Sequence, residues 1–292
     1  MASVQSPIRR TLKPLLFKLL GRRGYFHMQV YAKAKDIRER LVEEKEMALL
    51  PRLIQPGDQV LDIGANFAYY STRLSDLVGG GGKVVAFEPI PFTHDVCAAL
   101  LRKFGSTNVV LFQKGVGARD EQVKFSVPLQ DFGAMSAGQA HMAKRNNELD
   151  GKEDYYSFTD ATEFTCHVVA LDDFLTLDAR PLSFVKIDIE GAEYYALLGM
   201  RRLLEEHRPV VLIEIQPFFL KGFEIPEEAL VVLIDQLGYD LYLYDEGGAK
   251  RRRYEGGAKL RRHTGALIDS NYLMIHRDRV AEFEDILEDD LA

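Results

Sequence analysis

From residue 58 onward, short apolar runs alternate with longer stretches whose apolar residues recur every three or four positions. Short apolar runs bounded by glycine, proline or polar residues predict strands, and the three-to-four spacing predicts helices. The predicted strands are 60–63, 83–89, 108–113, 123–127, 164–170, 184–190, 209–217, 239–245 and 271–276. The predicted helices are 68–77, 92–104, 192–206 and 227–237. This alternation predicts an α/β fold with a mostly parallel sheet.

The last two predicted strands have no helix between them, so we expect an antiparallel hairpin at one edge of the sheet. Residues 35–54 have helical spacing and predict one helix that ends near Pro56. The chain therefore divides into an N-terminal helical extension, 1–54, and a main domain, 55–292. A polar stretch at about 128–163 interrupts the main domain, and long loops of this kind often act as lids or binding loops. The alternative is a surface insertion without a role in binding.

Charge and cysteine content narrow the class of protein. A net charge of −7 gives no global sign of nucleic-acid binding. Two cysteines, both in apolar runs, predict core thiols in a reducing compartment, and hence a cytoplasmic protein. No run is apolar for long enough to cross a membrane. Residues 1–24 are basic around a short apolar stretch, so they predict either peripheral membrane contact or a helix packed on the domain.

The first strand and the turn after it, VLDIGANFAYYS, contain the first candidate chemistry. Gly64 supplies a tight turn, but Asn66 stands where a dinucleotide-binding loop has a second glycine to approach a pyrophosphate. Asp62 and Asn66 place polar groups toward a zwitterionic or cationic ligand. S-adenosylmethionine has an amino-acid end, a sulfonium and a ribose, and it has no phosphate. Glu88 follows the second strand, 26 residues after Asp62, near the spacing at which an acid binds ribose hydroxyls.

Two further strand ends add candidates. The loop KGVGARD places Gly115 and Val116 where they would cover an adenine, although a plain turn is an equal alternative. The segment FVKIDIEGAE places Lys186, Asp188 and Glu190 on one face of a strand that is expected to be central and apolar. Ionisable groups there are costly unless they pair with each other or meet a ligand.

Several motifs together resemble the FkbM-type S-adenosylmethionine-dependent methyltransferases. They are VLDIGANFAYYS, VVAFEPIP, KGVGARD, LDDF, FVKIDIEGAE and VLIEIQP, in that order, between about residues 55 and 276. The resemblance implies a class I methyltransferase (Rossmann-like) fold with a seven-stranded, mostly parallel sheet and an antiparallel edge hairpin. It also implies O-methylation of a hydroxyl on a sugar, polyketide or other secondary metabolite. Ala68 is a departure, since the family more often has glycine there.

The resemblance implies that Asp62, Gly64, Asn66 and Glu88 bind the cofactor and that Asp188 and Glu190 lie near the transferred methyl group, and the strand ends add further candidates. The predicted cofactor-binding residues are Asp62, Gly64, Asn66, Tyr70, Glu88, Pro89, Gly115, Val116 and Asp188. An alcohol acceptor must lose a proton, so the transfer needs a general base. Asp188 and Glu190 are the predicted catalytic residues, and His94 and His141 are second choices.

A metal site is not predicted. Asp188, Glu190 and Glu214 are oxygen ligands of the kind that Mg²⁺ prefers, but the same acids serve equally for hydrogen bonding, so Mg²⁺ is not favoured. Zinc is not expected because no cluster of Cys and His is present. The expected partner is a small-molecule or glycan acceptor.

Other functions stay open at this point. One is a nicotinamide-dependent oxidoreductase, which Asn66 disfavours, and another is a non-catalytic scaffold that binds an adenosine ligand. A third is a membrane-docked protein recruited by residues 1–24. The near-repeat EGGAKRRRY and EGGAKLRRH, 246–263, predicts a basic loop that would contact anions or merely join two strands. The sequence indicates neither the acceptor nor an oligomeric state.

Overall fold

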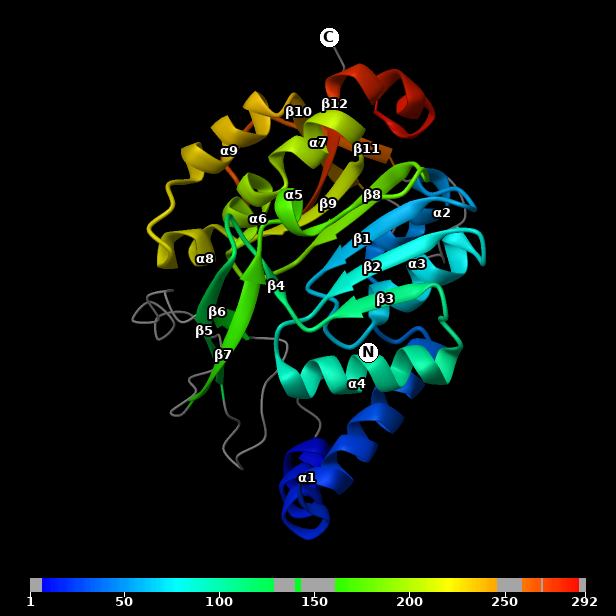
Figure 1. Cartoon of the computed structure of the whole chain (residues 1–292), viewed down its shortest axis with the longest axis vertical. Coiled ribbons are helices and arrows are strands. Elements are labelled where there is room, and N and C mark those ends of the chain that lie inside the picture. The colour runs from blue at the N-terminus through cyan, green and yellow to red at the C-terminus, as the bar shows by residue number, and fades with distance from the viewer. Residues whose placement is uncertain (1–6, 129–139, 143–160, 246–258, 269, 289–292) are drawn as a thin grey trace.

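The computed structural model describes residues 7–128, 140–142, 161–245, 259–268 and 270–288 (Figure 1). Its centre is an eight-stranded sheet in the order β11-β10-β12-β9-β8-β1-β2-β3. The strands are β1 (Gln59–Ile63), β2 (Lys83–Phe87), β3 (Val109–Phe112), β8 (Leu182–Ile187), β9 (Val210–Ile215), β10 (Tyr239–Asp245), β11 (Lys259–His263) and β12 (Ser270–His276). All seven predicted strands of the main sheet are present, and β11 is an eighth.

The sheet is parallel from β9 through β8, β1 and β2 to β3. At the other edge β12 is antiparallel to both β9 and β10, which confirms the predicted antiparallel hairpin. β11 pairs antiparallel with β10, so the prediction of a loop over 246–263 was wrong for residues 259–263. All five residues of β11 pair along β10, and this backbone pairing outweighs the polar character of the sequence KLRRH. Residues 246–258 lie outside the described part of the chain.

A second, smaller sheet has the order β4-β7-β5-β6 and lies beside the main sheet in Figure 1. Its strands are β4 (Gly115–Val116), β5 (Glu121–Pro128), β6 (His141–Met142) and β7 (Ala161–Val169). β5 and β7 are the two predicted strands that flank the polar insert, and they pair antiparallel over their full length. Most of the predicted lid falls on 129–139 and 143–160, outside the described residues.

Helices cover both faces of the main sheet. The apolar cores on the two faces are separate because side chains alternate along each strand. One face packs against α5 (Leu171–Phe174), α6 (Glu193–Gly199), α7 (Arg201–His207), α8 (Pro217–Gly222) and α9 (Glu227–Gln236). The other packs against η1 (Lys45–Ala48), α2 (Leu50–Leu53), α3 (Tyr69–Val78) and η4 (Arg277–Ile286). The predicted helix over 192–206 is two helices, with Met200 between them.

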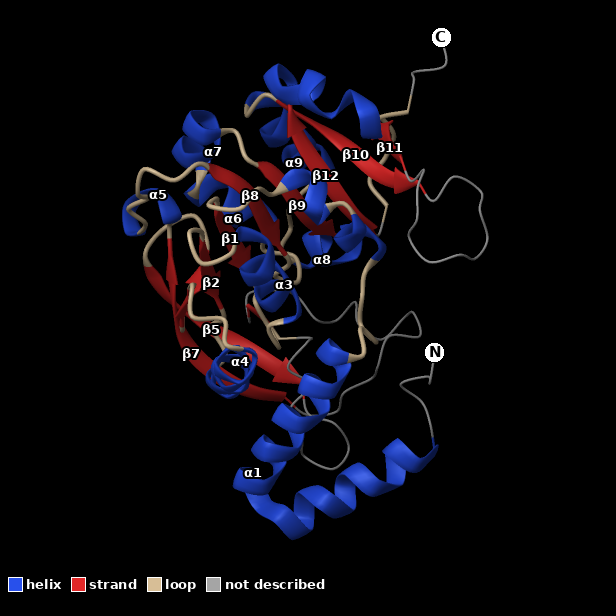
Figure 2. Ribbon diagram, turned by 90° about the vertical axis from the view of Figure 1, so that its right-hand side faces the viewer, coloured by secondary structure: helices blue, strands red, loops and turns tan. Residues whose placement is uncertain are grey.

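A third apolar cluster joins α4 (Pro91–Phe104) to α1 (Pro7–Arg38). Figure 2 shows α1 as two helical arms joined at a bend, and Gly21 has non-helical backbone angles there. Tyr25 stacks on Phe92 at 5.7 Å between ring centroids, and Ala34 is buried against α4. One face of the second arm of α1, with Tyr25 and Ala34, therefore packs on the domain, while membrane contact through residues 1–24 stays a prediction.

The prediction of one helix over 35–54 was wrong. α1 ends at Arg38, and the chain then turns through Arg40, which has a left-handed φ of 52°, before η1 and α2 begin. Helical spacing continued across this turn because apolar residues stand on both sides of it, although Ile37 packs against the cluster of α4 and the residues after the turn pack in a different one. Met47, Leu50 and Ile54 are buried in the cluster that includes Val60 and Phe184. In the described part of the chain, no helix is long and apolar enough to cross a membrane.

Candidate active site

The turn from β1 to α3 is held by backbone contacts that only glycine permits at its centre. Gly64 has φ +88°, and a Cβ atom there would lie 1.9 Å from the backbone oxygen of Asp188. The N–H groups of Gly64 and Ala65 both donate to the carbonyl of Phe87, at 3.0 and 2.9 Å. The turn is therefore clamped between the carboxyl ends of β2 and β8, where the strand order reverses and open α/β sheets bind ligands.

Asn66 and Glu88 form the side of this turn that the sequence predicts to hold the adenosyl group, which we call the adenosyl side. Glu88 is only 6% exposed. Its Oε2 accepts the N–H of Asn66 at 3.0 Å, and its Oε1 accepts the N–H of Ile90 at 2.9 Å. A carboxylate has about four acceptor positions, so capacity for ligand hydroxyls is left. The N–H of Asn66 is already used by Glu88, which disfavours a phosphate at this turn.

Burial raises the pKa of two acids at the turn. The Glu88 pKa rises to about 7 through burial, against the opposing effect of its two backbone hydrogen bonds. The Asp62 pKa rises to about 6, again through burial, although its Oδ2 accepts a short hydrogen bond from Ser71 and Lys186 lies near. A hydrogen-bond donor or a cation stabilises the ionised form of each acid. A ligand with hydroxyl or ammonium groups would supply one.

Four predicted cofactor residues share one small cavity of about 20 Å³. Gly64, Pro89, Gly115 and Val116 line it. The other lining residues, mostly apolar, are Ile63, Phe87, Lys114, Phe125, Met142, Ile189 and Ala192. The second sheet thus supplies apolar walls through Phe125 and Met142 and closes the cavity from the side opposite β1.

Lys114 lines this cavity and belongs to a series of polar contacts that the sequence did not predict. Its Nζ lies 2.7 Å from His167 Nδ1, and His167 Nε2 lies 2.7 Å from Asp120 Oδ1. The Lys114 ammonium also lies 5.3 Å from the ring centre of Phe174. These contacts hold the lysine head at the edge of the cavity.

On the other side of Gly64 lies a buried group of charges, which we call the acid cluster: Glu44, Asp62, Lys186, Asp188 and Glu214. Strand register places these charges on one face of the sheet, because Asp62 pairs with Lys186 and Lys186 pairs with Leu212, two residues before Glu214. Lys186 is 1% exposed. Its Nζ lies 3.5 Å from Asp188 Oδ2 and 5.2 Å from the ring centre of Tyr70.

Lys186 stays a cation despite its burial. Burial alone lowers its pKa, but Asp188, Glu44 and the other acids of the cluster outweigh that effect and raise the pKa above its ordinary value. One lysine thus faces four carboxyl groups. The sequence left open whether Lys186 merely neutralises an acid, and the ion pair with Asp188 shows that it does so for one of them.

Glu214 is the acid with the largest change within the cluster. Burial, followed by the charge of Asp188 and a hydrogen bond with its side chain, raises the Glu214 pKa to about 8. Gln216 Nε2 donates to Glu214 Oε1 at 2.8 Å. Asp188 itself is 32% exposed, so the pair opens to solvent on the Asp188 side.

Glu44, a member of the acid cluster, and Asn271, which contacts it, come from distant parts of the chain. Glu44 Oε2 accepts the Tyr70 hydroxyl at 2.6 Å and Asn271 Nδ2 at 3.2 Å. Asn271 pairs with Glu214 across β12 and β9. Neither Glu44 nor Asn271 was predicted. No local motif marks them, since 227 residues separate the two.

The loop after β8 separates Glu190 from the strand. The sequence predicted that Glu190 lies on the same strand face as Lys186 and Asp188. β8 instead ends at Ile187, and Glu190 has a left-handed φ of 56°. Gly191 follows with φ +102°, and a Cβ there would come within 2.7 Å of Phe219. Glu193 is buried, and its Oε1 accepts the N–H groups of Ile189 and Gly191 at 3.1 Å each. Glu193 thereby fixes the loop that presents Asp188 and Glu190.

The second-choice bases lie elsewhere. His94 is in α4 and contacts its neighbour Asp95 at 3.4 Å. His141 is buried in β6, where it pairs with Ser126 of β5. Across the described residues, no group of three or more His, Cys, Asp or Glu side chains is placed to hold a metal ion, and the acids weighed for Mg²⁺ do not form such a group.

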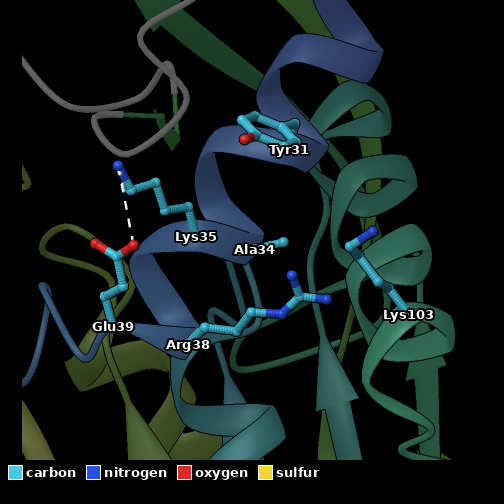
Figure 3. A pocket seen from close by; sticks show the side chains of 6 residues that line it. All are labelled: Tyr31, Ala34, Lys35, Arg38, Glu39 and Lys103. Carbon is cyan, nitrogen blue, oxygen red and sulfur yellow. Dashed lines mark ion pairs between the residues drawn. The ribbon is translucent and has the colours of Figure 1, made fainter.

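A wider groove of about 350 Å³ lies between α1 and α4 (Figure 3). Three cations, Lys35, Arg38 and Lys103, surround it, and Glu39 lies 3.9 Å from Lys35. None of the predicted site residues lines this groove. The chemistry therefore belongs to the strand ends and not to this larger hollow.

The residues at the strand ends fit S-adenosylmethionine. The buried Oδ1 of Asn66 has no hydrogen-bond partner and would accept one from a ligand. Glu88 and Asp62 are acceptors suited to ribose hydroxyls and an ammonium group. At the point where the strand order reverses, this parallel sheet has acids in place of a phosphate-binding glycine loop. These features define an α/β protein that suits a nucleoside cofactor without phosphates.

Residues 62–241, more than half of the chain, match the family described as "Methyltransferase FkbM domain". The protein belongs to this family. Membership confirms the predicted family and, with it, S-adenosylmethionine as the family's cofactor.

Two sequence relatives match over short segments. The protein-L-isoaspartate O-methyltransferase of Aeropyrum pernix is 42% identical over 65 residues, which are 22% of this chain and 25% of that protein. The enzyme of the same name from Methanococcus aeolicus is 36% identical over 56 residues, 19% of this chain and 26% of that protein. The chain thus spans about a quarter of the length of the curated relatives it matches.

Two solved structures are similar in overall shape. The methyltransferase FkbM of Methylobacillus flagellatus KT is 16% identical, with 87% of this chain and 59% of that chain covered and a TM-score of 0.43. The O-methyltransferase of Bacillus cereus is 11% identical, with 85% and 89% covered and a TM-score of 0.42. With sequence identities of 16% and 11%, both similarities are distant.

Proposed function

We propose that the protein transfers a methyl group from S-adenosylmethionine to a hydroxyl oxygen of a small-molecule or glycan acceptor, such as a sugar, a polyketide or another secondary metabolite. One observation supports this most directly. The backbone carbonyl of Asp188 lies against Gly64 of the turn, and its partly exposed carboxylate pairs with Lys186, so this residue joins the turn to the acid cluster. The curated relatives are named O-methyltransferases, which also supports oxygen as the target atom.

The turn would hold the cofactor through its own acceptors. Glu88 accepts ribose hydroxyls while its backbone hydrogen bonds fix the carboxylate in place. Asp62 and Asn66 accept from the amino-acid end. Bound there, S-adenosylmethionine supplies a positively charged methyl donor, so the protein has no need to create an electrophile and acts mainly by alignment.

Asp188 is the proposed proton acceptor for the hydroxyl, with Glu190 beside it on the same loop. Lys186 orients the Asp188 carboxylate through their ion pair, and Glu193 fixes the loop from below. Positioned general bases contribute about 10² to 10⁴ in rate, so this one group matters greatly for an alcohol acceptor.

The first test is cofactor binding. We expect the purified chain to bind S-adenosylhomocysteine in a calorimetric titration, and Glu88→Gln to weaken binding by about 10- to 100-fold, because charge-assisted bonds to hydroxyls are lost. Glu205→Gln is the matched control, since Glu205 pairs only with Arg201 on the exposed face of α7. Absence of binding, or an unchanged affinity in Glu88→Gln, would contradict the proposal.

The second test is transfer. The protein is incubated with S-adenosylmethionine carrying a ¹³C methyl group and with fractionated small-molecule and glycan extracts, and new ¹³C methyl signals are identified by NMR. We expect a methoxy shift. Asp188→Asn should reduce the rate by at least about 100-fold while S-adenosylhomocysteine affinity stays within about threefold. Binding without transfer across all fractions would favour a non-catalytic adenosine-binding scaffold instead.

A further inference from the structure

Positive charge gathers at the N-terminal end of the chain. The first 35 residues contain eight Lys and Arg residues and no Asp or Glu, although the whole chain has a net charge of −7. The residues after position 35 therefore carry a net charge of −15. A basic segment joined to an acidic domain is typical of proteins that contact nucleic acid or an anionic membrane surface.

The second arm of α1, residues 22–38, exposes a row of basic and aromatic side chains. Arg23, His27, Tyr31, Lys35 and Arg38 are all exposed and recur every three or four positions, so they lie along one side of the helix. We call these five residues the basic stripe. Another side of the same arm packs on α4, so the basic stripe is left in contact with solvent, and Tyr31 is 72% exposed.

The basic stripe borders the groove of about 350 Å³ between α1 and α4 (Figure 3). Tyr31, Lys35 and Arg38 line this groove from α1, and Lys103 lines it from α4. Glu39 is the one acid among the six lining residues. It lies 3.9 Å from Lys35, which is too long for a hydrogen bond, and both side chains are about half exposed. Three cations therefore have donors to offer to an anionic group such as a phosphate.

Cations at the end of a helix also have a structural explanation. Lys35 and Arg38 lie in the last turn of α1, and Lys103 lies in the last turn of α4. The partial negative charge of a helix C-terminus favours cations there. That effect is confined to the last turn, so it does not explain Arg23 and His27, which lie about three or more turns earlier. Nor does it explain why the first 35 residues have no acid.

The first arm of α1, residues 7–20, favours a lipid surface over nucleic acid. Its apolar residues Ile8, Leu12, Leu15 and Leu19 recur every three or four positions, and four cations stand between them in the sequence. This pattern is typical of helices that lie in the plane of a membrane with an apolar stripe among the lipid chains. Nucleic acid offers phosphates but no apolar phase. Figure 2 shows this arm at the outer edge of the molecule, beyond the bend.

We propose that α1 docks the protein on an anionic membrane surface. The phosphates of the lipid headgroups bind in the groove between α1 and α4, and the apolar residues of the first arm enter the lipid chains. The ring of Tyr31 suits the boundary between the two, because it is apolar along its body and polar at its tip. This interaction goes beyond the proposed function and holds whatever the acceptor is. None of the predicted site residues lines the groove, so docking and cofactor binding can occur together.

The test measures how residues 1–292 partition onto sedimented vesicles at about 100 mM salt. One preparation is phosphatidylcholine with about 30% phosphatidylserine, a second has phosphatidylglycerol in place of phosphatidylserine, and a third is phosphatidylcholine alone. We expect binding to both anionic preparations, and at least about tenfold weaker partitioning onto phosphatidylcholine alone. Binding to the anionic vesicles should weaken as the salt is raised to about 500 mM.

A combined variant tests the groove. Lys35→Gln, Arg38→Gln and Lys103→Gln in one protein should weaken partitioning onto the anionic vesicles by about 100-fold, since each cation near such a surface strengthens binding by about fivefold. All three side chains are exposed, so the far-UV circular dichroism and the thermal midpoint should stay close to those of the parent.

The matched control removes three exposed cations from other parts of the surface. It combines Arg201→Gln on α7, Lys221→Gln on α8 and Arg261→Gln on β11, which lie away from α1 in Figure 1. The net charge changes by the same amount, and partitioning should stay within about threefold of the parent value.

A second variant tests the first arm. Leu12→Gln combined with Leu15→Gln interrupts the apolar pattern without a change in charge. Partitioning onto the anionic vesicles should fall by at least about tenfold, because apolar burial in the lipid is lost. The binding that is left should depend more steeply on salt, since only charge attraction remains.

Three results would overturn the inference. The first is equal partitioning onto anionic and neutral vesicles, or none onto either. The second is unchanged partitioning when the three groove cations are replaced. The third is a short DNA duplex that displaces the protein from vesicles and binds Leu12→Gln/Leu15→Gln as tightly as the parent, which would assign the basic stripe to nucleic acid. None of these results bears on cofactor binding or methyl transfer, which are tested separately.

Discussion

The two sides of the Gly64 turn are built in different ways. On the adenosyl side, Glu88 accepts from the backbone N–H groups of Asn66 and Ile90, which are 22 and 2 residues away in the chain. On the side of the acid cluster, Glu44 receives side chains that are 26 and 227 residues away. Backbone contacts within a short segment fix the proposed cofactor side. Side chains from remote segments build the acid cluster, so the proposed reactive side depends on tertiary contacts.

The largest effect is expected from a substitution at Gly64, which should disrupt both sides of the turn at once. Gly64→Ala would place a Cβ 1.9 Å from the backbone oxygen of Asp188 and force an unfavourable φ on alanine. We expect the free energy of unfolding to fall by about 4 kcal/mol and S-adenosylhomocysteine binding to be lost. Urea denaturation and calorimetry measure the two effects.

Gly105→Ala is the control for that change. Gly105 also has a positive φ, +70°, but a Cβ there would meet no atom within 4 Å. It should cost only about 1 kcal/mol and leave binding intact. Equal costs at the two positions would mean that the close approach to Asp188 does not hold the turn.

The next effect separates the acid cluster from the adenosyl side. Lys186→Met removes the buried cation and leaves the neighbouring carboxyl groups without a counter-charge, so we expect a loss of about 3 kcal/mol at pH 8. The loss should shrink at pH 5, because protonated acids no longer repel each other. Affinity for S-adenosylhomocysteine should fall far less than in Glu88→Gln.

Lys83→Met, on strand β2 of the same sheet, is matched to it. Lys83 pairs with Asp178 at 3.8 Å, and both side chains are partly exposed. Such surface pairs contribute about 1 kcal/mol or less, with little change between pH 5 and pH 8. A similar cost for both lysines would show that Lys186 is not electrostatically special.

The smallest effect concerns the adenosyl side alone. The Glu88 pKa is raised to about 7 from an ordinary 4.5, so the native state binds a proton that the unfolded chain has released. This contribution to stability is complete below pH 4.5 and is lost as the pH rises through 7. Between pH 6 and pH 8 it removes about 1.4 kcal/mol.

Glu88→Gln should remove that part of the pH dependence, and urea denaturation at several pH values measures it. The exposed Glu205→Gln should follow the parent profile. Identical profiles for Glu88→Gln and the parent protein would show that Glu88 does not contribute to the pH dependence in this range.

The same contrast explains what the sequence predicted. The order of strands and helices and the residues of the cofactor turn follow from local pattern: apolar runs, a glycine at a turn and an acid after a strand. Gly64, Pro89, Gly115 and Val116 lie around one cavity as the motifs implied. The sequence also suggested that Lys186 pairs with an acid, because a lysine in a central strand is otherwise too costly.

Local pattern did not predict three other features. Glu44 and Asn271 reach the site through tertiary contacts that no spacing encodes. β11 forms because its backbone pairs with β10, although Arg261 and Arg262 are exposed and polar. The break after Arg38 was hidden because apolar residues stand at helical spacing on both sides of it, although they pack in two different clusters.

The segment between Glu44 and Ile54 has a practical meaning for protein engineering. It lies ahead of the matched region, which starts at residue 62, yet it fills the core beside α3 and supplies Glu44 to the acid cluster. A fragment trimmed to the matched region would lack Leu50, Leu53 and Glu44, and it would expose the core side chains that the two leucines cover, such as Leu74 and Phe184. Any shortened form intended for crystallisation or acceptor screening should begin upstream of Glu44.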